Sequence, residues 1–163
     1  MNTKTCFFIG HRDTPESVFP SLRAAVEHHI TACGVDRFVV GHYGAFDRLA
    51  AKAVLSAKQQ HPHVTLTMLL PYHPAERIIN LPEGYNGTLY PEGMEKVPRK
   101  FAIVKANQYM IEHTDYIIAY AWHTASNTSN VLQHARSRNI PICNLAERLS
   151  LSSSIIHFPQ SPP

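Results

Sequence analysis

The chain has 163 residues, a formal net charge of +3 and 44% hydrophobic residues, which is typical of a single globular domain. Its lysines and arginines are scattered rather than gathered in a basic stripe, and this distribution disfavours a nucleic-acid partner. No apolar run approaches the ~20 residues of a membrane span, and the three cysteines lack C-x-x-C spacing, so we expect a cytoplasmic protein with reduced thiols and no membrane partner.

Short apolar runs alternate with helical patterns along the chain. The runs that indicate strands are Cys6–Ile9, Phe38–Val40, Leu66–Leu70, Tyr116–Tyr120 and Ile140–Cys143. Helical spacing predicts helices around Leu22–Ile30, over Phe46–Gln59, over Pro98–His113, and from Asn127 or Thr128 to Arg138. Strands that alternate with helices favour right-handed βαβ crossovers. The sequence therefore predicts an α/β fold of three layers, α/β/α, with a mainly parallel sheet of about five or more strands.

Two of these strands end at a glycine that is followed by a polar turn and a helix. Gly10, His11 and Arg12 follow the first strand, and the stretch from Gly41 to Gly44 follows the second. Backbone N–H groups at a helix N-terminus attract anions, and glycine lets an anion approach them closely. The pattern indicates a phosphate cradle for a nucleotide-type ligand, with His42 and Tyr43 as further binding candidates.

Arg12 and Asp47 are the charged candidates of these turns, and each has two interpretations. Arg12 either clamps a phosphate or forms a salt bridge with Asp13 or another local acid. Asp47 falls in the first turn of the second helix, where a carboxylate stabilises the helix dipole. Alternatively, Asp47 accepts ribose hydroxyls or lies beside a sugar carbon, which makes it the catalytic candidate of the chain.

Residues 71–97 interrupt the alternation of strands and helices, because prolines and glycines are frequent there. We interpret this segment as a loop insertion that serves as a lid or side wall, since long irregular segments in compact domains are commonly functional. Tyr85, Asn86 and Tyr90 suit base stacking and hydrogen bonding in such a lid. A floppy insertion is the alternative.

Further candidates lie after the third and fourth long strands. Because parallel strands end at one edge of a sheet, Pro71 and Tyr72 are expected at the ligand crevice, together with Trp122, Asn127 and Thr128. Trp122 either stacks on a base or packs against the protein. Asn127 and Thr128 offer a second anion contact or an ordinary helix cap.

Histidines are numerous, and four of them, His11, His42, His73 and His123, fall at this same edge. A metal site is therefore conceivable. No H-E-x-x-H or comparable ligand set occurs in the sequence, however. We expect neither a metal nor a cofactor.

Four stretches, taken in order, resemble the SLOG superfamily. They are Ile9-Gly10-His11-Arg12-Asp13, Val40-Gly41-x-Tyr43-Gly44-x-Phe46-Asp47-x-Leu49-Ala50, Leu70-Pro71-Tyr72, and Asn107-x-x-Met110-Ile111 with Asp115 to Tyr120. More narrowly, the chain is similar to the DUF1273 or YpsA-like bacterial branch over roughly residues 5–145. The resemblance implies a Rossmann-like fold that binds nucleotides or nucleotide-derived sugars. We expect one such domain over residues 1–148, a tail over residues 149–163, and an oligomeric state that is open and includes a homo-oligomer.

The resemblance also bears on activity, because the superfamily includes lonely-guy phosphoribohydrolases, DNA-processing proteins and domains that sense NAD-derived signals. The P-G-G-x-G-T-x-x-E motif of the phosphoribohydrolases is absent here, and the corresponding loop reads Ala125-Ser126-Asn127-Thr128-Ser129-Asn130. This departure favours binding or sensing of a nucleotide or ADP-ribose-like ligand. One alternative is an enzyme that acts at the N-glycosidic bond of a ribosyl C1 through Asp47. The other is an accessory protein of nucleic-acid processing.

Overall fold

The computed structural model describes residues 2–122 and 127–147. In this part of the chain six strands form one sheet in the order β4-β3-β2-β1-β5-β6, and every neighbouring pair is parallel. The strands are β1 (Thr5–Gly10), β2 (Arg37–Val40), β3 (Thr65–Leu69), β4 (Gly87–Leu89), β5 (Tyr116–Tyr120) and β6 (Ile142–Asn144). The predicted three-layer α/β fold with a mainly parallel sheet is confirmed. The predicted tail over residues 149–163 lies outside the described residues.

The chain builds this sheet outward from β1 in two directions. It adds β2, β3 and β4 on one side, and then returns to place β5 and β6 on the other side. In the register, Cys6 of β1 lies opposite Phe38 of β2 and Tyr116 of β5. In open α/β sheets, ligands bind outside the carboxyl ends of the strands near such a reversal. The end of β1 at Gly10 therefore faces the region where a ligand is expected.

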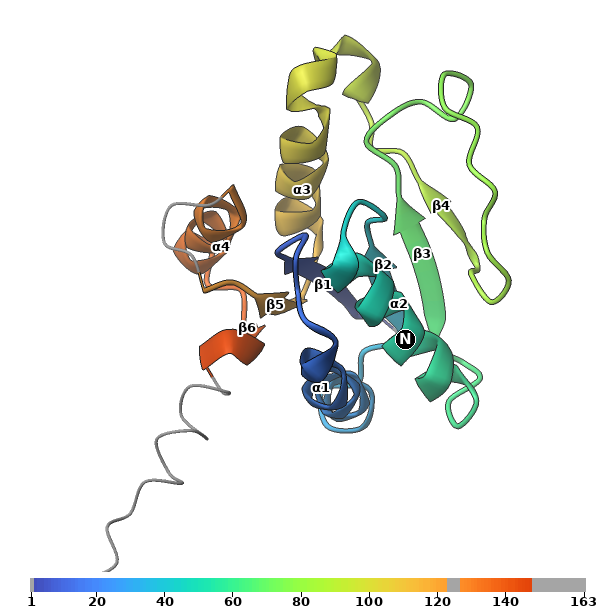
Figure 1. Ribbon diagram of the computed structural model, residues 1–163, viewed down its shortest axis with the longest axis vertical. Coiled ribbons are helices and arrows are strands. Elements are labelled where there is room, and N and C mark those ends of the chain that lie inside the picture. Colours follow the sequence, from blue (N-terminus) through green and yellow to red (C-terminus); the bar gives the residue numbers. More distant parts are fainter. Residues whose placement is uncertain (1, 123–126, 148–163) are drawn as a thin grey trace, which may run out of the picture.

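In the part of the chain that the structure describes, α-helices cover the two faces of the sheet (Figure 1). They are α1 (Phe19–Thr31), α2 (Ala45–Lys58), α3 (Ala102–His113) and α4 (Asn127–Ser137). Successive residues of a strand point to opposite faces, so Phe8 packs with α1 and α2, whereas Phe7 packs with α3 and α4. Both phenylalanines are about 1% exposed, so β1 is buried on both sides as a central parallel strand. Among the described residues, no helix is long and apolar enough to cross a membrane.

Prolines set the starts of two helices. A 3-10 turn, η1 (Glu16–Val18), precedes α1, and Pro20 lies in the first turn of that helix, where its missing N–H would have no intrahelical partner. The third predicted helix begins later than its pattern indicated. Pro98 is followed by a 3-10 turn, η3 (Arg99–Phe101), and regular helix begins at Ala102.

The predicted loop insertion over residues 71–97 contains a strand that the sequence did not reveal. β4 extends the sheet beside β3, and a 3-10 turn, η2 (Met94–Lys96), follows it. The side chain of Asn86 fixes the start of β4, because its Oδ1 accepts hydrogen bonds from the Leu66 N–H at 3.0 Å and from Lys58 Nζ at 2.6 Å. A strand of three residues is too short to show a period of two, which is why the pattern of apolar residues missed it.

Candidate functional site

A cavity of about 310 Å³ opens at the carboxyl ends of β1, β2 and β3. Its walls come from the first turn of α2, from α3 and from the start of α4. This volume lies at the lower end of the range, roughly 300–1,000 Å³, of small-molecule sites. The candidates from the sequence that line the cavity are Gly10, His11, Arg12, Gly41, Tyr43, Gly44, Asp47, Pro71 and Thr128.

Arg12 lies exposed in the wall of this cavity. The salt bridge to Asp13 or another acid, which was one interpretation of the sequence, is not formed among the described residues. The positive charge of Arg12 is close enough to Asp47 to lower the pKa of that carboxyl in part. Arg12 therefore adds a positive charge to the cavity wall, and a planar guanidinium carries the fork of N–H donors that matches a phosphate.

Neighbouring protein atoms leave no room for a side chain at two of the cavity glycines. A Cβ at Gly44 would lie 2.8 Å from Arg12 Cα, and a Cβ at Gly41 would lie 2.8 Å from Asp47 Oδ2. The Ala45 N–H, which opens α2, donates to the Arg12 carbonyl oxygen at 2.9 Å. The sequence predicted that these glycines leave space for an anion. Gly44 has an additional role, because it allows the turn after β2 to pack on the turn after β1.

Asp47 is the carboxylate of the cavity, and it is partly buried. Burial raises its pKa from 3.8 to about 6, while the hydrogen bond from the Tyr43 N–H to Oδ2 at 3.1 Å and the charge of Arg12 oppose that rise. Asp47 therefore fixes the backbone of the turn that carries Tyr43. With a pKa of about 6 it also changes protonation state close to neutral pH.

Asp47→Asn is expected to remove a pH dependence of stability. The pKa of Asp47 in the folded protein is above its value in the unfolded chain, so protonation of Asp47 favours the folded state. This contribution to the free energy of unfolding is fully present below about pH 4 and is lost as the pH rises through about 6. The asparagine of the Asp47→Asn variant does not titrate in this range. We expect the variant to be more stable than wild type at pH 7.5 and to converge with wild type below pH 4, as measured by urea unfolding across this range. If the free energies of unfolding of wild type and variant ran parallel across this pH range, the raised pKa of Asp47 would be contradicted.

An aromatic cluster stands beside the cavity at the ends of β2 and β3. The ring of Tyr43 lies 4.1 Å from that of His42 and 6.1 Å from that of Tyr72, centroid to centroid. Burial lowers the pKa of His42, the charge of Arg77 adds to this effect, and a hydrogen bond with the Leu69 backbone opposes it. Tyr43 lines the cavity and His42 and Tyr72 do not, so the latter two support the Tyr43 ring from outside.

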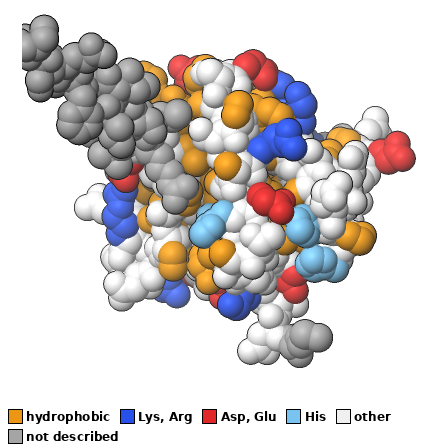
Figure 2. Space-filling model, turned by 90° about the horizontal axis from the view of Figure 1, so that it is seen from below, with side chains coloured by type: hydrophobic (Ala, Val, Ile, Leu, Met, Phe, Trp, Pro, Cys, Tyr) orange, Lys and Arg blue, Asp and Glu red, His pale blue; other side chains and the backbone are white. Residues whose placement is uncertain are grey.

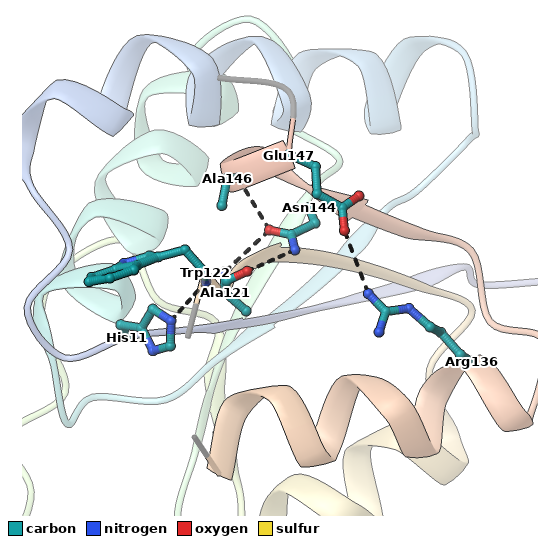
Figure 3. A network of polar contacts seen from close by, with 7 residues as sticks. All are labelled: His11, Ala121, Trp122, Arg136, Asn144, Ala146 and Glu147. Carbon is teal, nitrogen blue, oxygen red and sulfur yellow. Dashed lines mark hydrogen bonds and ion pairs between the residues drawn. The ribbon is translucent and has the colours of Figure 1, made fainter. Parts of the chain in front are cut away.

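His11 links the end of β1 to the chain that leaves β5 (Figure 3). Its Nε2 accepts a hydrogen bond from the Trp122 backbone N–H at 3.0 Å, and the residue is only 7% exposed. On the other side, the Asn144 side-chain amide exchanges hydrogen bonds with the backbone N–H and carbonyl of Ala121. The chain that leaves β5 is thereby held between two side chains.

Trp122 itself is 54% exposed and lies outside the cavity lining, with its ring 5.7 Å from that of His11. Residues 123–126, including the predicted candidate His123, lie outside the described residues, as does the side chain of Asn127. Among the described residues, no group of three His, Cys, Asp or Glu side chains is arranged to hold a metal ion.

The three predicted lid residues do not line the cavity. Tyr85 packs against the core beneath α1 and α2, and burial, followed by the charge of Asp47, raises its pKa. Asn86 is engaged with β3, as described above, and Tyr90 packs on the α3 side with its ring 5.2 Å from that of His73. Closure of the segment over a ligand stays a prediction.

Residues of α3 form a wall that the sequence interpretation missed. Ile103, Val104 and Asn107 line the cavity from one face of this helix. None of the hydrogen bonds found among the described residues uses the Asn107 side-chain amide. The sequence does contain a signal for this wall. Asn107 is a polar residue four positions after Ile103 and next to the buried Ala106, so it interrupts the apolar face of the helix.

Comparisons with known proteins place the fold. No family model matches the chain. The uncharacterized SPbeta prophage-derived protein YoqJ of Bacillus subtilis (strain 168) is 28% identical over 137 residues, which cover 71% of this chain and 78% of that protein. A structure of DNA processing protein A from Helicobacter pylori aligns with a TM-score of 0.58 over 92% of this chain and 73% of that one, at 16% identity. DNA processing protein A from Helicobacter pylori is described as binding single-stranded DNA.

These comparisons support a Rossmann-like fold, which the likeness to DNA processing protein A shows. They also correct one prediction, that the scattered charges disfavour a nucleic-acid partner. That prediction is wrong, because a protein with this fold, DNA processing protein A, binds single-stranded DNA. Folding, rather than the order of residues in the chain, decides which arginines lie near one another. Basic residues that are scattered in the sequence therefore do not exclude a nucleic-acid partner.

Proposed function

We propose that this protein binds single-stranded nucleic acid and holds one nucleotide in the cavity at the carboxyl edge of β1, β2 and β3. The observation that carries this proposal is the pairing, in one cavity, of Arg12 without a carboxylate partner among the described residues and the aromatic ring of Tyr43. A guanidinium matches a phosphate, and an aromatic ring stacks on a base of any identity. The single-stranded DNA binding of DNA processing protein A supports the choice of ligand.

A single strand fits these features better than a duplex. Bases inside a duplex are stacked and paired, whereas a single strand presents a base that can enter a cavity. Seen from below, on the side of α1, the described surface mixes acidic, basic, histidine and apolar side chains without a broad basic patch (Figure 2). That face lies opposite the carboxyl ends of the strands (Figure 1). At the cavity itself, Arg12 is the one arginine or lysine among the described lining residues, so we expect the strand to bind through few phosphates.

Fluorescence anisotropy with a labelled oligothymidylate of about 20 nucleotides tests the proposal. We expect binding at low salt, at least tenfold weaker binding of a duplex of equal length, and a logarithmic salt slope of about −0.7 for each phosphate contacted. Because only a few arginines adjoin the cavity, a slope between about −1 and −3 is expected. Absence of binding to the single strand at low salt would refute the proposed function.

A free nucleotide or nucleotide-derived sugar is the second candidate ligand, and Asp47 is the observation that favours it. A carboxyl with a pKa of about 6 in the cavity wall suits general acid–base catalysis of N-glycosidic cleavage, in which the C1–N bond breaks, the leaving base takes up a proton and the attacking water gives one up. This candidate agrees with the narrower DUF1273 or YpsA-like resemblance, which also stays a proposal. Competition by ADP-ribose or a mononucleotide at micromolar concentration, or release of a free base seen by chromatography, would favour it over the oligonucleotide.

A further inference from the structure

Two arginines share one aromatic ring beside the cavity. The Cζ atom of Arg77 lies 4.2 Å from the centroid of the Tyr72 ring, and the Cζ atom of Arg99 lies 5.9 Å from the same centroid. Arg77 comes from the turn after β3, whereas Arg99 lies in η3, just before α3. The fold therefore brings two exposed positive charges together from separate segments of the chain.

Among the described residues, neither Arg77 nor Arg99 forms an ion pair with a carboxylate. Burial, followed by the charges of Glu95 and Glu76, raises the pKa of Tyr90, so these two acids lie near the same segment without pairing with either arginine. Two like charges held at one ring repel each other, and an anion bound between them would remove that repulsion.

Tyr43 connects this arginine pair to the cavity. Burial raises the pKa of Tyr43, and the positive charge of Arg77 opposes that rise, so the guanidinium of Arg77 lies near the Tyr43 hydroxyl. The rings of Tyr43 and Tyr72 meet edge to face at 84°. Since Tyr43 lines the cavity, an anion at Arg77 lies directly beyond the wall against which a base would stack.

We propose that Arg77 and Arg99, held on Tyr72, form a second phosphate site that binds the neighbouring phosphate of a strand whose nucleotide occupies the cavity. This proposal rests on the proposed function. It makes the preferred ligand a single strand of two or more nucleotides, because a mononucleotide carries no second phosphate to reach the arginine pair. The ring keeps both guanidinium groups in place before the strand arrives, which reduces the entropy lost on binding.

Isothermal titration calorimetry on the full chain tests the second site with thymidine 5′-monophosphate and the dinucleotide pTpT. We expect wild type to bind pTpT at least tenfold more tightly than the monophosphate. The Arg77→Gln/Arg99→Gln variant should lose most of that gain while its affinity for the monophosphate changes less than threefold. The control Arg23→Gln/Arg138→Gln removes the same charge from exposed positions that do not line the cavity, and it should leave both affinities unchanged.

The outcomes separate this proposal from the proposed function. If wild type binds neither pTpT nor longer strands, the proposed function fails. If the strands bind and depend on Arg12 but not on Arg77 and Arg99, only the second phosphate site is overturned. ADP-ribose, whose two phosphates are directly joined, is the remaining probe. Tighter binding of ADP-ribose than of pTpT, with the same dependence on Arg77 and Arg99, would overturn the assignment of this site to a nucleic-acid strand.

Discussion

Arg12→Ala is expected to weaken the binding of single-stranded oligonucleotide about 10- to 100-fold. A hydrogen bond to a charged group contributes about 1.5–3 kcal/mol, and about 1.4 kcal/mol corresponds to a tenfold change in affinity. Arg12 is exposed and forms no ion pair among the described residues, and Asp47, whose pKa the charge of Arg12 lowers, keeps its hydrogen bond from the Tyr43 N–H when Arg12 is removed. The melting temperature should therefore stay within about 2 °C of wild type. Anisotropy titrations and thermal melts on the same samples check both expectations.

Two companion variants make the Arg12 result specific. Arg23→Ala removes an equally exposed arginine from α1 and should change the affinity less than twofold. Arg12→Lys keeps the charge but loses the planar fork, and it should recover only part of the affinity. An affinity of Arg12→Ala equal to that of wild type would remove Arg12 from the binding site.

Gly10→Ala is expected to lower the free energy of unfolding by about 1–3 kcal/mol, the usual cost of an overpacked core. The added Cβ would lie 2.6 Å from Cδ1 of Phe46, a ring that is fully buried between β1 and α2. For a chain of this size each kcal/mol shifts the melting temperature by about 2–4 °C, so a decrease of about 2–12 °C should be seen by calorimetry. The strain is steric, because the φ angle of Gly10 is not positive.

A matched glycine and a double variant test this explanation. A Cβ at Gly87 in β4 would meet no atom within 4 Å, so Gly87→Ala should be neutral or slightly stabilising. In a Phe46→Leu background the smaller side chain leaves space, and Gly10→Ala should cost less than it does in wild type. Equal costs in both backgrounds would show that Phe46 is not the obstacle.

The sequence was sufficient for most of the architecture. β5 was predicted with its observed bounds, Tyr116–Tyr120, because its five residues form an uninterrupted apolar run, of which the central three are buried. The second helix was predicted within one residue of Ala45–Lys58, since its apolar residues recur at helical spacing and Asp47 marks its first turn. Residues at the ends of successive parallel strands must share one edge of the sheet, and this rule predicted that Gly10, Gly41 and Pro71 would meet.

The class of fold, the edge of the sheet at which the cavity opens and the polar turns around the cavity could all be predicted from local sequence patterns. The set of side chains that meet at the cavity became known only from the folded chain. Asn107 faces the cavity from a helix distant in the chain, and Arg77 and Arg99 come together only because both lie on Tyr72. Local patterns follow from backbone periodicity, which acts over a few residues. Contacts between segments depend on packing across the whole sheet, and a scattered set of arginines becomes one positive site only when the chain has folded.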